Sequence, residues 1–321
     1  MVNLNEIICC PRCLSALDFA TGKPMCTSAM CTYARDGFPT SGGQPVLVDF
    51  DQSVFSRANY NEIDAAVLPS KVKFAGAVRD YTNRSFRTRL RELLFGSNFL
   101  ASQKGAQVLE ALKNQAADPR LLIIGGGALG GGVDAFYGDD SVQVVATDVY
   151  ASPNTCLLAD AHCLPFKNEV FDGVWITAVL EHVLEPHVVV EQIYRVLKPG
   201  GLIYAETPFM QQVHEGPHDF TRFTRSGHRW LFRKFDQIDA GILGGPGSAV
   251  VWAIRYFWRG LGTGDKGATL LTAPFFWIRY FDRFMHGHQF SDGALGVFFF
   301  GRKTEHALHP KDIIAYYANQ R

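Results

Sequence analysis

The sequence RLLIIGGGALG, residues 120–130, joins an apolar run to a glycine-rich loop and decides the fold class. The apolar side chains at 121–124 are typical of a buried strand, and glycines directly after it allow backbone amides to meet a polar ligand at a helix N-terminus. Further strands are expected at 142–147, 171–176 and 201–206, and a helix at 188–197. Strands that alternate with helices predict a doubly wound α/β fold around a mostly parallel sheet.

The glycine loop and two later carboxylates indicate an adenosine-containing cofactor. Gly125, Gly127 and Gly130 form a Gly-x-Gly-x-x-Gly pattern, which alone suits a dinucleotide or S-adenosylmethionine and also occurs in purely structural turns. Asp148 ends the next strand, where a carboxylate accepts hydrogen bonds from both ribose hydroxyls. Asp160 comes after a third strand, where it can accept from an adenine amino group. Dehydrogenases seldom need this contact, so Asp160 favours S-adenosylmethionine.

The segments that follow carry a family resemblance. They are, in order, Asp160-Ala161, Leu164-Pro-Phe166, Phe171-Asp-Gly-Val174, Leu180-Glu-His-Val183 and Arg195-Val-Leu-Lys-Pro-Gly-Gly201. With these motifs the chain resembles the class I S-adenosylmethionine-dependent methyltransferases, in particular their type 11 group. The resemblance implies a seven-stranded, Rossmann-like, mostly parallel sheet and S-adenosylmethionine as methyl donor.

The resemblance also implies a set of cofactor contacts. The loop glycines flank the cofactor, one carboxylate binds the ribose, a second carboxylate and its neighbour meet the adenine, and a threonine begins the loop beneath the methionine portion. In this order the residues are Gly125, Gly127, Gly130, Asp148, Asp160, Ala161 and Thr177. In such relatives the position of His182 caps the methionine loop, and a structural role for it is as good an interpretation as a catalytic one.

One position departs from the family pattern. The family usually carries an acidic residue two positions before the first loop glycine, where it helps to hold the methionine ammonium, but this chain has Ile123. The ammonium then needs backbone carbonyls or another side chain. An inactive relative that does not bind the cofactor is the alternative interpretation.

Cysteines cluster near the N-terminus. Cys10 with Cys13 and Cys26 with Cys31 form two close pairs, the spacing of a site in which four thiolates hold one structural zinc ion. Cys9 is left over, and free buried cysteines are the alternative. Bound zinc would stabilise a segment that has little core of its own. The segment resembles the small zinc-ribbon partners of tRNA methyltransferases, whose roles range from RNA contact to partner binding.

A loop after the fifth strand gathers the candidate catalytic residues His214, His218, Asp219 and Arg222. Loops at the carboxyl ends of parallel strands bind substrates in open α/β sheets. His218 with Asp219, or His214, is the candidate base, and Arg222 is expected to orient an anionic substrate group. A loop that only shapes a lid is the alternative. Similar loops occur in methyltransferases of glycan or secondary-metabolite pathways, which implies a small or carbohydrate-like acceptor.

An insertion at about 247–290 is rich in aromatic and basic residues. Residues 249–258 and 270–285 are expected to form two amphipathic helices. Such side chains suit a membrane surface or a lipid-linked substrate. A dimer interface, a cap over the substrate pocket and simple core packing are the alternatives.

Length and composition suggest the organisation of the chain. We expect a zinc ribbon at 1–50, a helical linker at 51–118 with a helix at 85–95, a methyltransferase domain at 119–302 and a tail helix at 303–321. With 31 basic and 31 acidic residues, the chain has no general attraction to nucleic acid, which is possible as a partner but not favoured. No signal peptide or membrane-spanning run is evident, so a cytoplasmic protein is expected, peripheral at the inner membrane face if the insertion binds lipid.

These observations predict a methyltransferase that uses S-adenosylmethionine to methylate an oxygen or nitrogen of a small-molecule, glycan or lipid-linked acceptor. The rival within the same chemistry is methylation of ribosomal or transfer RNA, with the zinc ribbon and Arg84, Arg87, Arg89 and Arg91 as the RNA contact. A noncatalytic adaptor that binds a partner protein is the second alternative.

Overall fold

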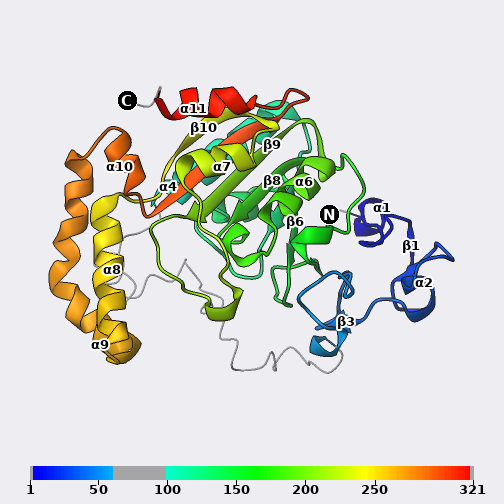
Figure 1. The fold of residues 1–321 in the computed structure, drawn as a ribbon. Helices are drawn as coiled ribbons and strands as arrows, with labels where there is room; N and C mark the ends of the chain where they lie inside the picture. Colours follow the sequence, from blue (N-terminus) through cyan, green and yellow to red (C-terminus); the bar gives the residue numbers. More distant parts are fainter. Residues whose placement is uncertain (1–2, 61–98, 319–321) are drawn as a thin grey trace.

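The computed structural model describes residues 3–60 and 99–318, and a seven-stranded sheet lies at its centre (Figure 1). The strand order is β10-β11-β9-β8-β5-β6-β7, and β11 alone in this sheet runs antiparallel to its neighbours. The strands are β5 Arg120–Ile124, β6 Gln143–Asp148, β7 Leu157–Leu158, β8 Phe171–Thr177, β9 Leu197–Pro208, β10 Phe235–Ile242 and β11 Gly296–Lys303. The doubly wound, mostly parallel fold predicted from the sequence is confirmed.

Both faces of the sheet are covered, which explains why its central strands are apolar throughout. In β5 the side chains of Leu122 and Ile124 join one hydrophobic core, and those of Leu121 and Ile123 join the other. The helices α6 Pro186–Val196 and α7 Arg225–Leu231 pack in the first core, and α4 Phe99–Gln115 and α5 Asp134–Tyr137 in the second. The carboxyl ends of the parallel strands are thereby left for a ligand site.

The N-terminal segment lies along the edge strand β7. Val46 pairs with Leu158 as a parallel bridge, and the N–H of Leu47 donates to the Leu158 carbonyl at 2.8 Å. Ile8 forms an antiparallel bridge with Phe166. The elements of this segment are α1 Leu4–Ile7, β1 Leu17–Asp18, β2 Met25–Cys26, α2 Tyr33–Asp36, β3 Thr40–Ser41, β4 Gln44–Pro45 and the 3-10 turn η1 Arg57–Asn59.

The N-terminal segment shares a hydrophobic core with the sheet. Ile7, Phe38 and Leu47 are buried in the same hydrophobic core as Leu122 of β5. The rings of Tyr33 and Phe38 stack with centroids 4.2 Å apart and belong to that core as well. The sequence pattern marked the segment as cysteine-rich but carried no sign of this packing, because long-range contacts leave no local signature.

The insertion between β10 and β11 projects from the opposite end of the sheet (Figure 1). It comprises α8 Pro246–Gly260, α9 Gly264–Thr272, the 3-10 helix η5 Ala273–Phe284 and α10 His288–Asp292. The prediction of a single helix at 270–285 is wrong, because α9 ends at Thr272 and the 3-10 helix η5 follows it. Pro274 lies at this junction, where a ring without an N–H cannot continue the hydrogen bonds of an α-helix.

Other expectations meet the structure in part. The tail helix expected at 303–321 corresponds to α11 Pro310–Ala318. The helix expected at 85–95 and the four linker arginines lie outside the described residues. Within the described ranges, no helix combines the length and the apolar composition needed to cross a bilayer.

Candidate functional site

A cavity of about 420 Å³ lies at the carboxyl ends of β5, β6 and β8. The cavity has the size and the mixed apolar and polar lining of a cofactor site. Six of the seven predicted cofactor residues line it, namely the carboxylates Asp148 and Asp160 together with Gly125, Gly130, Ala161 and Thr177. The structure therefore brings the two predicted carboxylates, Asp148 and Asp160, to one cavity.

The glycine loop needs glycine for conformation and for space. Gly125 has a φ of +80°, a conformation that other residues rarely adopt. The N–H of Gly127 donates to Asp148 Oδ2 at 2.8 Å. A Cβ at Gly127 would lie 2.6 Å from the ring of Tyr150 and 2.7 Å from that same carboxylate oxygen. Gly127 thus holds the Asp148 carboxylate in its position at the cavity.

Asp148 is held by the backbone around it. Its Oδ1 accepts from the N–H of Val149 at 2.7 Å, and its Oδ2 accepts from Gly127. Burial raises the pKa of Asp148 to about 6, although the N–H groups of Gly127, Val149 and Tyr150 oppose this shift. At neutral pH the group is a carboxylate with lone pairs left to accept hydrogen bonds from a ligand.

Asp160 begins a short 3-10 helix, Ala161–Cys163, as its N-cap. Its carboxylate accepts from the backbone N–H of His162 at 2.9 Å, lies 2.6 Å from Nδ1 of that ring, and accepts from the hydroxyl of Ser53. Burial alone would raise the pKa of Asp160, but the hydrogen bonds from His162 and Ser53 outweigh it and the pKa is lowered. Asp160 is therefore an oriented, ionised acceptor at the cavity wall.

The sequence analysis did not single out residues 53–60, part of which lines the cavity. Val54 and Phe55 line it, and Ser53 donates to Asp160. The hydroxyl of Tyr60 donates to the carbonyl of Val149 at 2.9 Å, next to Asp148 in the sequence. These contacts join residues far apart in the sequence, so no sequence motif predicted them. Residues 53–60 reach the cavity because the preceding N-terminal segment packs along the sheet.

The first cavity is also lined by Ile123, Trp175 and Glu206. Ile123 is 2% exposed and offers no charge to an ammonium group. Glu206, near the end of β9, lines the cavity and accepts a hydrogen bond of 2.6 Å from the Tyr204 hydroxyl. Trp175 is fully buried, and its indole N–H has no hydrogen-bond partner among the described residues. A carboxylate and a donor are thus present despite the departure at Ile123.

A second cavity of about 380 Å³ adjoins the first. Both cavities are lined by Ala178, Glu206 and His214, so the two share a boundary. Ala178 follows β8 and has a φ of +54°, a strained conformation for a residue with a Cβ. The second cavity is otherwise lined by residues that include Leu100, Glu181, Thr207, Leu243, Ser248 and Leu295.

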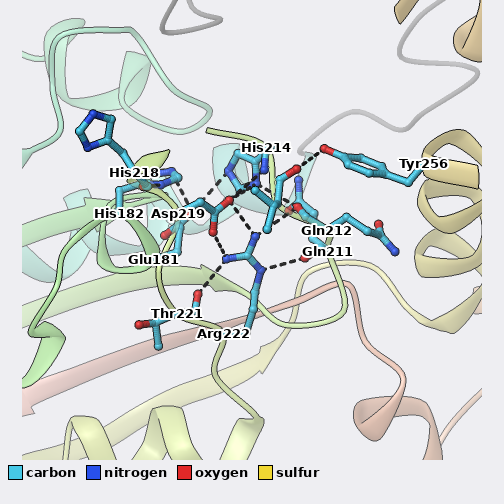
Figure 2. Close-up of polar contacts among 11 residues, drawn as sticks. Glu181, His182, Gln211, Gln212, His214, His218, Asp219, Thr221, Arg222 and Tyr256 are labelled. Carbon is cyan, nitrogen blue, oxygen red and sulfur yellow. Dashed lines mark hydrogen bonds and ion pairs between the residues drawn. The ribbon is translucent and has the colours of Figure 1, made fainter. Parts of the chain in front are cut away.

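The four predicted catalytic residues lie on the loop after β9 and differ in their contacts (Figure 2). All five N–H groups of Arg222 are engaged: they donate to the carboxylate of Asp219 and to the backbone carbonyls of Gln211, Gln212 and Thr221. Burial raises the pKa of Asp219, but Arg222 and the backbone of His214 outweigh it and lower the pKa to about 2. Arg222 and Asp219 therefore hold the loop together.

The dyad expected between His218 and Asp219 is not formed. The ring of His218 stacks on Phe55 with centroids 6.2 Å apart, and Asp219 instead accepts from the backbone N–H of His214 at 2.8 Å. Nδ1 of His214 lies 3.3 Å from the Gln212 carbonyl and 3.4 Å from Asp219 Oδ2, both of them acceptors. Nδ1 is therefore the protonated nitrogen in a neutral ring, and Nε2 of His214 is left with its lone pair at the boundary of the two cavities.

Glu181 is the functional candidate that the sequence analysis did not single out. Its side chain is 1% exposed, and its Oε1 lies 3.6 Å from Nε2 of His182 and 3.8 Å from Nε2 of His214. Burial raises the pKa of Glu181 to about 8, with Arg222 opposing the shift. Glu181 lies within the motif at 180–183, where it stands with His182 between two apolar residues. That pattern is the sequence signal that could have identified it.

His182 is fixed by the same loop. Its Nδ1–H donates to the backbone carbonyl of His218 at 2.7 Å, which leaves Nε2 facing Glu181. Burial lowers the pKa of His182, so the ring is neutral at pH 7. The rings of His182 and His214 meet edge to face with centroids 5.1 Å apart.

The four predicted zinc ligands lie together. Sγ atoms of Cys10, Cys13, Cys26 and Cys31 all lie within 4.8 Å of one another. The Cys10–Cys31 separation is 3.8 Å and the Cys13–Cys26 separation 3.4 Å. Sulfurs bound to one tetrahedral zinc ion at about 2.3 Å lie about 3.8 Å apart, so this set fits the ion.

Comparison with known proteins finds similarity to methyltransferases over part of the chain. Residues 134–205 match the family described as methyltransferase domain. A demethylmenaquinone methyltransferase of Clavibacter sepedonicus is 39% identical over 82 residues, which are 25% of this chain and 29% of that protein. The chain thus spans less than a third of the length of this curated relative.

Two solved structures show the range of similar proteins. Phosphoethanolamine N-methyltransferase 2 of Haemonchus contortus, in complex with S-adenosyl-L-methionine, has a TM-score of 0.41 and 17% identity, covering 70% of this chain and 59% of its own. The methyltransferase in a complex with the Haloferax volcanii Trm112 methyltransferase activator has a TM-score of 0.40 and 17% identity, covering 67% of this chain and 97% of its own. Residues 134–205 are thus similar to the methyltransferase domain family, and they lie within a seven-stranded, Rossmann-like sheet.

Proposed function

We propose that this protein is an S-adenosylmethionine-dependent methyltransferase. The observation that carries the proposal is a single cavity lined by the glycine loop, Asp148 and Asp160, which opens beside a second cavity of acceptor size. A lone pair of the acceptor atom attacks the methyl carbon while the carbon–sulfur bond breaks and its electrons remain on sulfur. The products are the methylated acceptor, S-adenosylhomocysteine and one proton. Alignment of acceptor and methyl supplies much of the rate acceleration, because the sulfonium is already activated.

The cofactor contacts follow the geometry of the first cavity. Asp148 accepts from the ribose hydroxyls, Asp160 and Ala161 meet the adenine, and Gly125, Gly127 and Gly130 allow the close approach of the backbone. Thr177 begins the loop below the methionine portion. Phe55 closes the cavity from the N-terminal side.

His214 is the candidate base for an acceptor in the second cavity. Its Nε2 lone pair lies at the boundary of the two cavities, and Asp219 and the Gln212 carbonyl orient the ring. Arg222 acts as a positioning residue through Asp219, since its donors are already engaged. His218 lies against Phe55 on the cofactor side and has no proposed role in proton transfer. Apolar side chains such as Leu243 suit a small-molecule, glycan or lipid-linked acceptor better than a nucleic acid.

Titration calorimetry with S-adenosylmethionine tests the proposal. We expect binding of one cofactor per chain with micromolar affinity, followed by transfer of isotope-labelled methyl to a component of a metabolite extract, identified by mass spectrometry. Acceptors should accumulate without the methyl group in cells that lack the protein. A chain that releases no heat with the cofactor and loads no label would instead be the noncatalytic adaptor.

We propose that Glu206 replaces the missing acid at position 123 as the partner of the methionine ammonium. The replacement Glu206→Gln keeps the shape but removes the charge, so the affinity for both S-adenosylmethionine and S-adenosylhomocysteine should fall about 10-fold, the value of one charge-assisted hydrogen bond. Calorimetry with both ligands provides the measurement. Glu305→Gln, an exposed change in the tail after β11, is the matched control. An unchanged affinity in the Glu206 variant contradicts the assignment.

The zinc ribbon is proposed to hold the wall of the cofactor cavity in place. Cys10, Cys13, Cys26 and Cys31 would bind the ion, which supplies folding free energy and no chemistry at the acceptor. The chain that leaves the ribbon contributes Ser53 and Phe55 to the cavity. A ribbon packed on its own catalytic domain in this way takes a structural role within one chain.

The insertion is proposed to contact a membrane surface. Its outer side chains are unusually exposed for apolar residues, with Phe284 at 76% and Leu270 at 74%. Arg255 and Arg279 stack on neighbouring aromatic rings, an arrangement suited to the headgroup level. In a flotation experiment, the protein should float with vesicles that contain about a quarter anionic lipid. The double variant Leu270→Ser, Phe284→Ser should stay unbound at the bottom of the gradient. A protein that stays unbound but dimerises through this surface would favour the interface alternative.

A further inference from the structure

Three metal-ligating side chains converge at the boundary of the two cavities. One ligand atom from each of Glu181, His182 and His214 lies within 4.8 Å of the others, and Oε1 of Glu181 is 3.6 Å and 3.8 Å from Nε2 of the two rings. They come from the turn after β8 and from the loop after β9, so two separate elements supply them (Figure 2). No other such group of three or more appears in the described part of the chain except the four cysteines.

The orientation of the rings favours an ion over a hydrogen-bonded cluster. His182 donates its Nδ1–H to the His218 carbonyl, and Nδ1 of His214 faces the Gln212 carbonyl and Asp219. Both Nε2 atoms therefore present lone pairs toward the carboxyl group of Glu181, at distances of 3.6 and 3.8 Å that are too long for hydrogen bonds. Metal-binding histidines are held in this way, with one ring nitrogen donating to a carbonyl or carboxylate and the other left for the metal.

The spacing and the burial also fit an ion. Around a tetrahedral ion with bonds of about 2.1 Å, ligand atoms lie about 3.4 Å apart. The Glu181 carboxylate lies 3.6 Å from His182 and 3.8 Å from His214, a few tenths of an ångström longer and beyond hydrogen-bond length. Oε2 of Glu181 is buried, with no hydrogen-bond partner among the described residues. A buried carboxylate oxygen of this kind is costly unless a cation or a donor faces it.

We propose that Glu181, His182 and His214 bind one divalent transition-metal ion. Two imidazoles and one carboxylate suit ions such as Mn²⁺, Fe²⁺ or Zn²⁺, and three protein ligands leave coordination positions open. Glu181 and His214 line the second cavity, and the two histidines line the first, so the open positions face the junction of cofactor and acceptor. The ion site rests on geometry alone; its use rests on the proposed methyl transfer.

An ion at this place defines the acceptor class. Its open positions would accept an oxygen ligand, and an acceptor hydroxyl bound there would be methylated on oxygen. The ion would lower the pKa of a bound hydroxyl, so that the hydroxyl releases its proton to water before the methyl is transferred. In this case His214 binds the ion and does not abstract the proton. The resulting oxyanion then attacks the methyl carbon, and the carbon–sulfur electrons remain on sulfur.

Manganese titration of the full, zinc-loaded chain tests this site without any cofactor. Electron paramagnetic resonance of free Mn²⁺ should reveal one bound ion per chain. His214→Ala and Glu181→Gln should each weaken binding at least 10-fold, and His187→Ala, an exposed histidine at the start of α6, should leave it unchanged. His214 lies on a loop, so its variant is expected to fold even if the buried Glu181→Gln change does not.

The outcomes separate the ion from the methyl transfer. Binding that is equal in all variants, or none up to millimolar Mn²⁺, overturns the ion site and leaves the proposed methyltransferase standing. Binding that depends on the three ligands, in a protein that takes up no S-adenosylmethionine by calorimetry, supports the ion site and overturns the methyltransferase. When both bind, omission of Mn²⁺ should reduce O-methylation at least 10-fold.

Discussion

Asp148→Ala is expected to weaken S-adenosylmethionine binding about 100-fold or more. The carboxylate accepts from Gly127 at 2.8 Å and from Val149 at 2.7 Å, which aims its remaining lone pairs into the cavity. Each hydrogen bond to a charged acceptor contributes about 1.5–3 kcal/mol, and the ribose supplies two donors. The loss of about 3 kcal/mol or more corresponds to this change in dissociation constant, measured by calorimetry.

Two controls distinguish the ribose contact from general damage to the loop. Asp140→Ala removes an exposed carboxylate outside the cavity and should leave the affinity unchanged. The thermal midpoint of the Asp148 variant shows whether the now unpaired N–H groups of Gly127 and Val149 unfold the chain. A folded Asp148 variant with native affinity would falsify the adenosine site at this cavity.

The pH dependence of binding provides a further check on Asp148. Burial raises its pKa to about 6, so the carboxylate that accepts from the ribose is present above that pH and takes up a proton as the pH falls through it. Cofactor affinity in the native chain should therefore decline below about pH 6. The alanine variant should lose this part of the pH dependence, because the titrating group is gone.

Cys13→Ser is expected to release zinc and to lower the thermal midpoint by about 10 °C or more. Cys13 is exposed, so the exchange of sulfur for oxygen costs little unless the thiolate binds an ion. Structural zinc contributes about 10 kcal/mol or more to the folding of zinc-finger peptides, and even a third of this shifts the midpoint of a chain of this size by such an amount. Calorimetry and elemental analysis for zinc provide the measurements.

The effect should extend from the ribbon to the cofactor cavity. Phe38 and Leu47 share the core of the sheet, and the chain continues to Ser53 and Phe55 at the cavity wall. Zinc loss should therefore weaken S-adenosylmethionine binding as well. Cys156→Ser, a half-buried thiol outside the four-sulfur group, is the matched control. Full zinc content and a native midpoint in the Cys13 variant would show that the four thiols are not one site.

Local sequence was sufficient for the parts of the protein that depend on backbone conformation and short spacing. The apolar run of β5, the glycine loop and Asp148 follow one another along the chain, and a parallel sheet brings the ends of successive strands to one edge whatever lies elsewhere. The two cysteine pairs are likewise set by spacing within short turns, and their sulfurs meet as expected.

Only the tertiary structure decided what the remaining side chains do. His218 and Asp219 are adjacent in the sequence, yet Asp219 is engaged by His214 and Arg222, because loop geometry turns neighbouring side chains in different directions. The ribbon joins the core of the sheet, Ser53 reaches Asp160, and Glu181 meets two histidines through contacts between distant parts of the chain. Such contacts arise from packing, which buries side chains from separate elements against each other and leaves no periodic or spacing signal in the sequence.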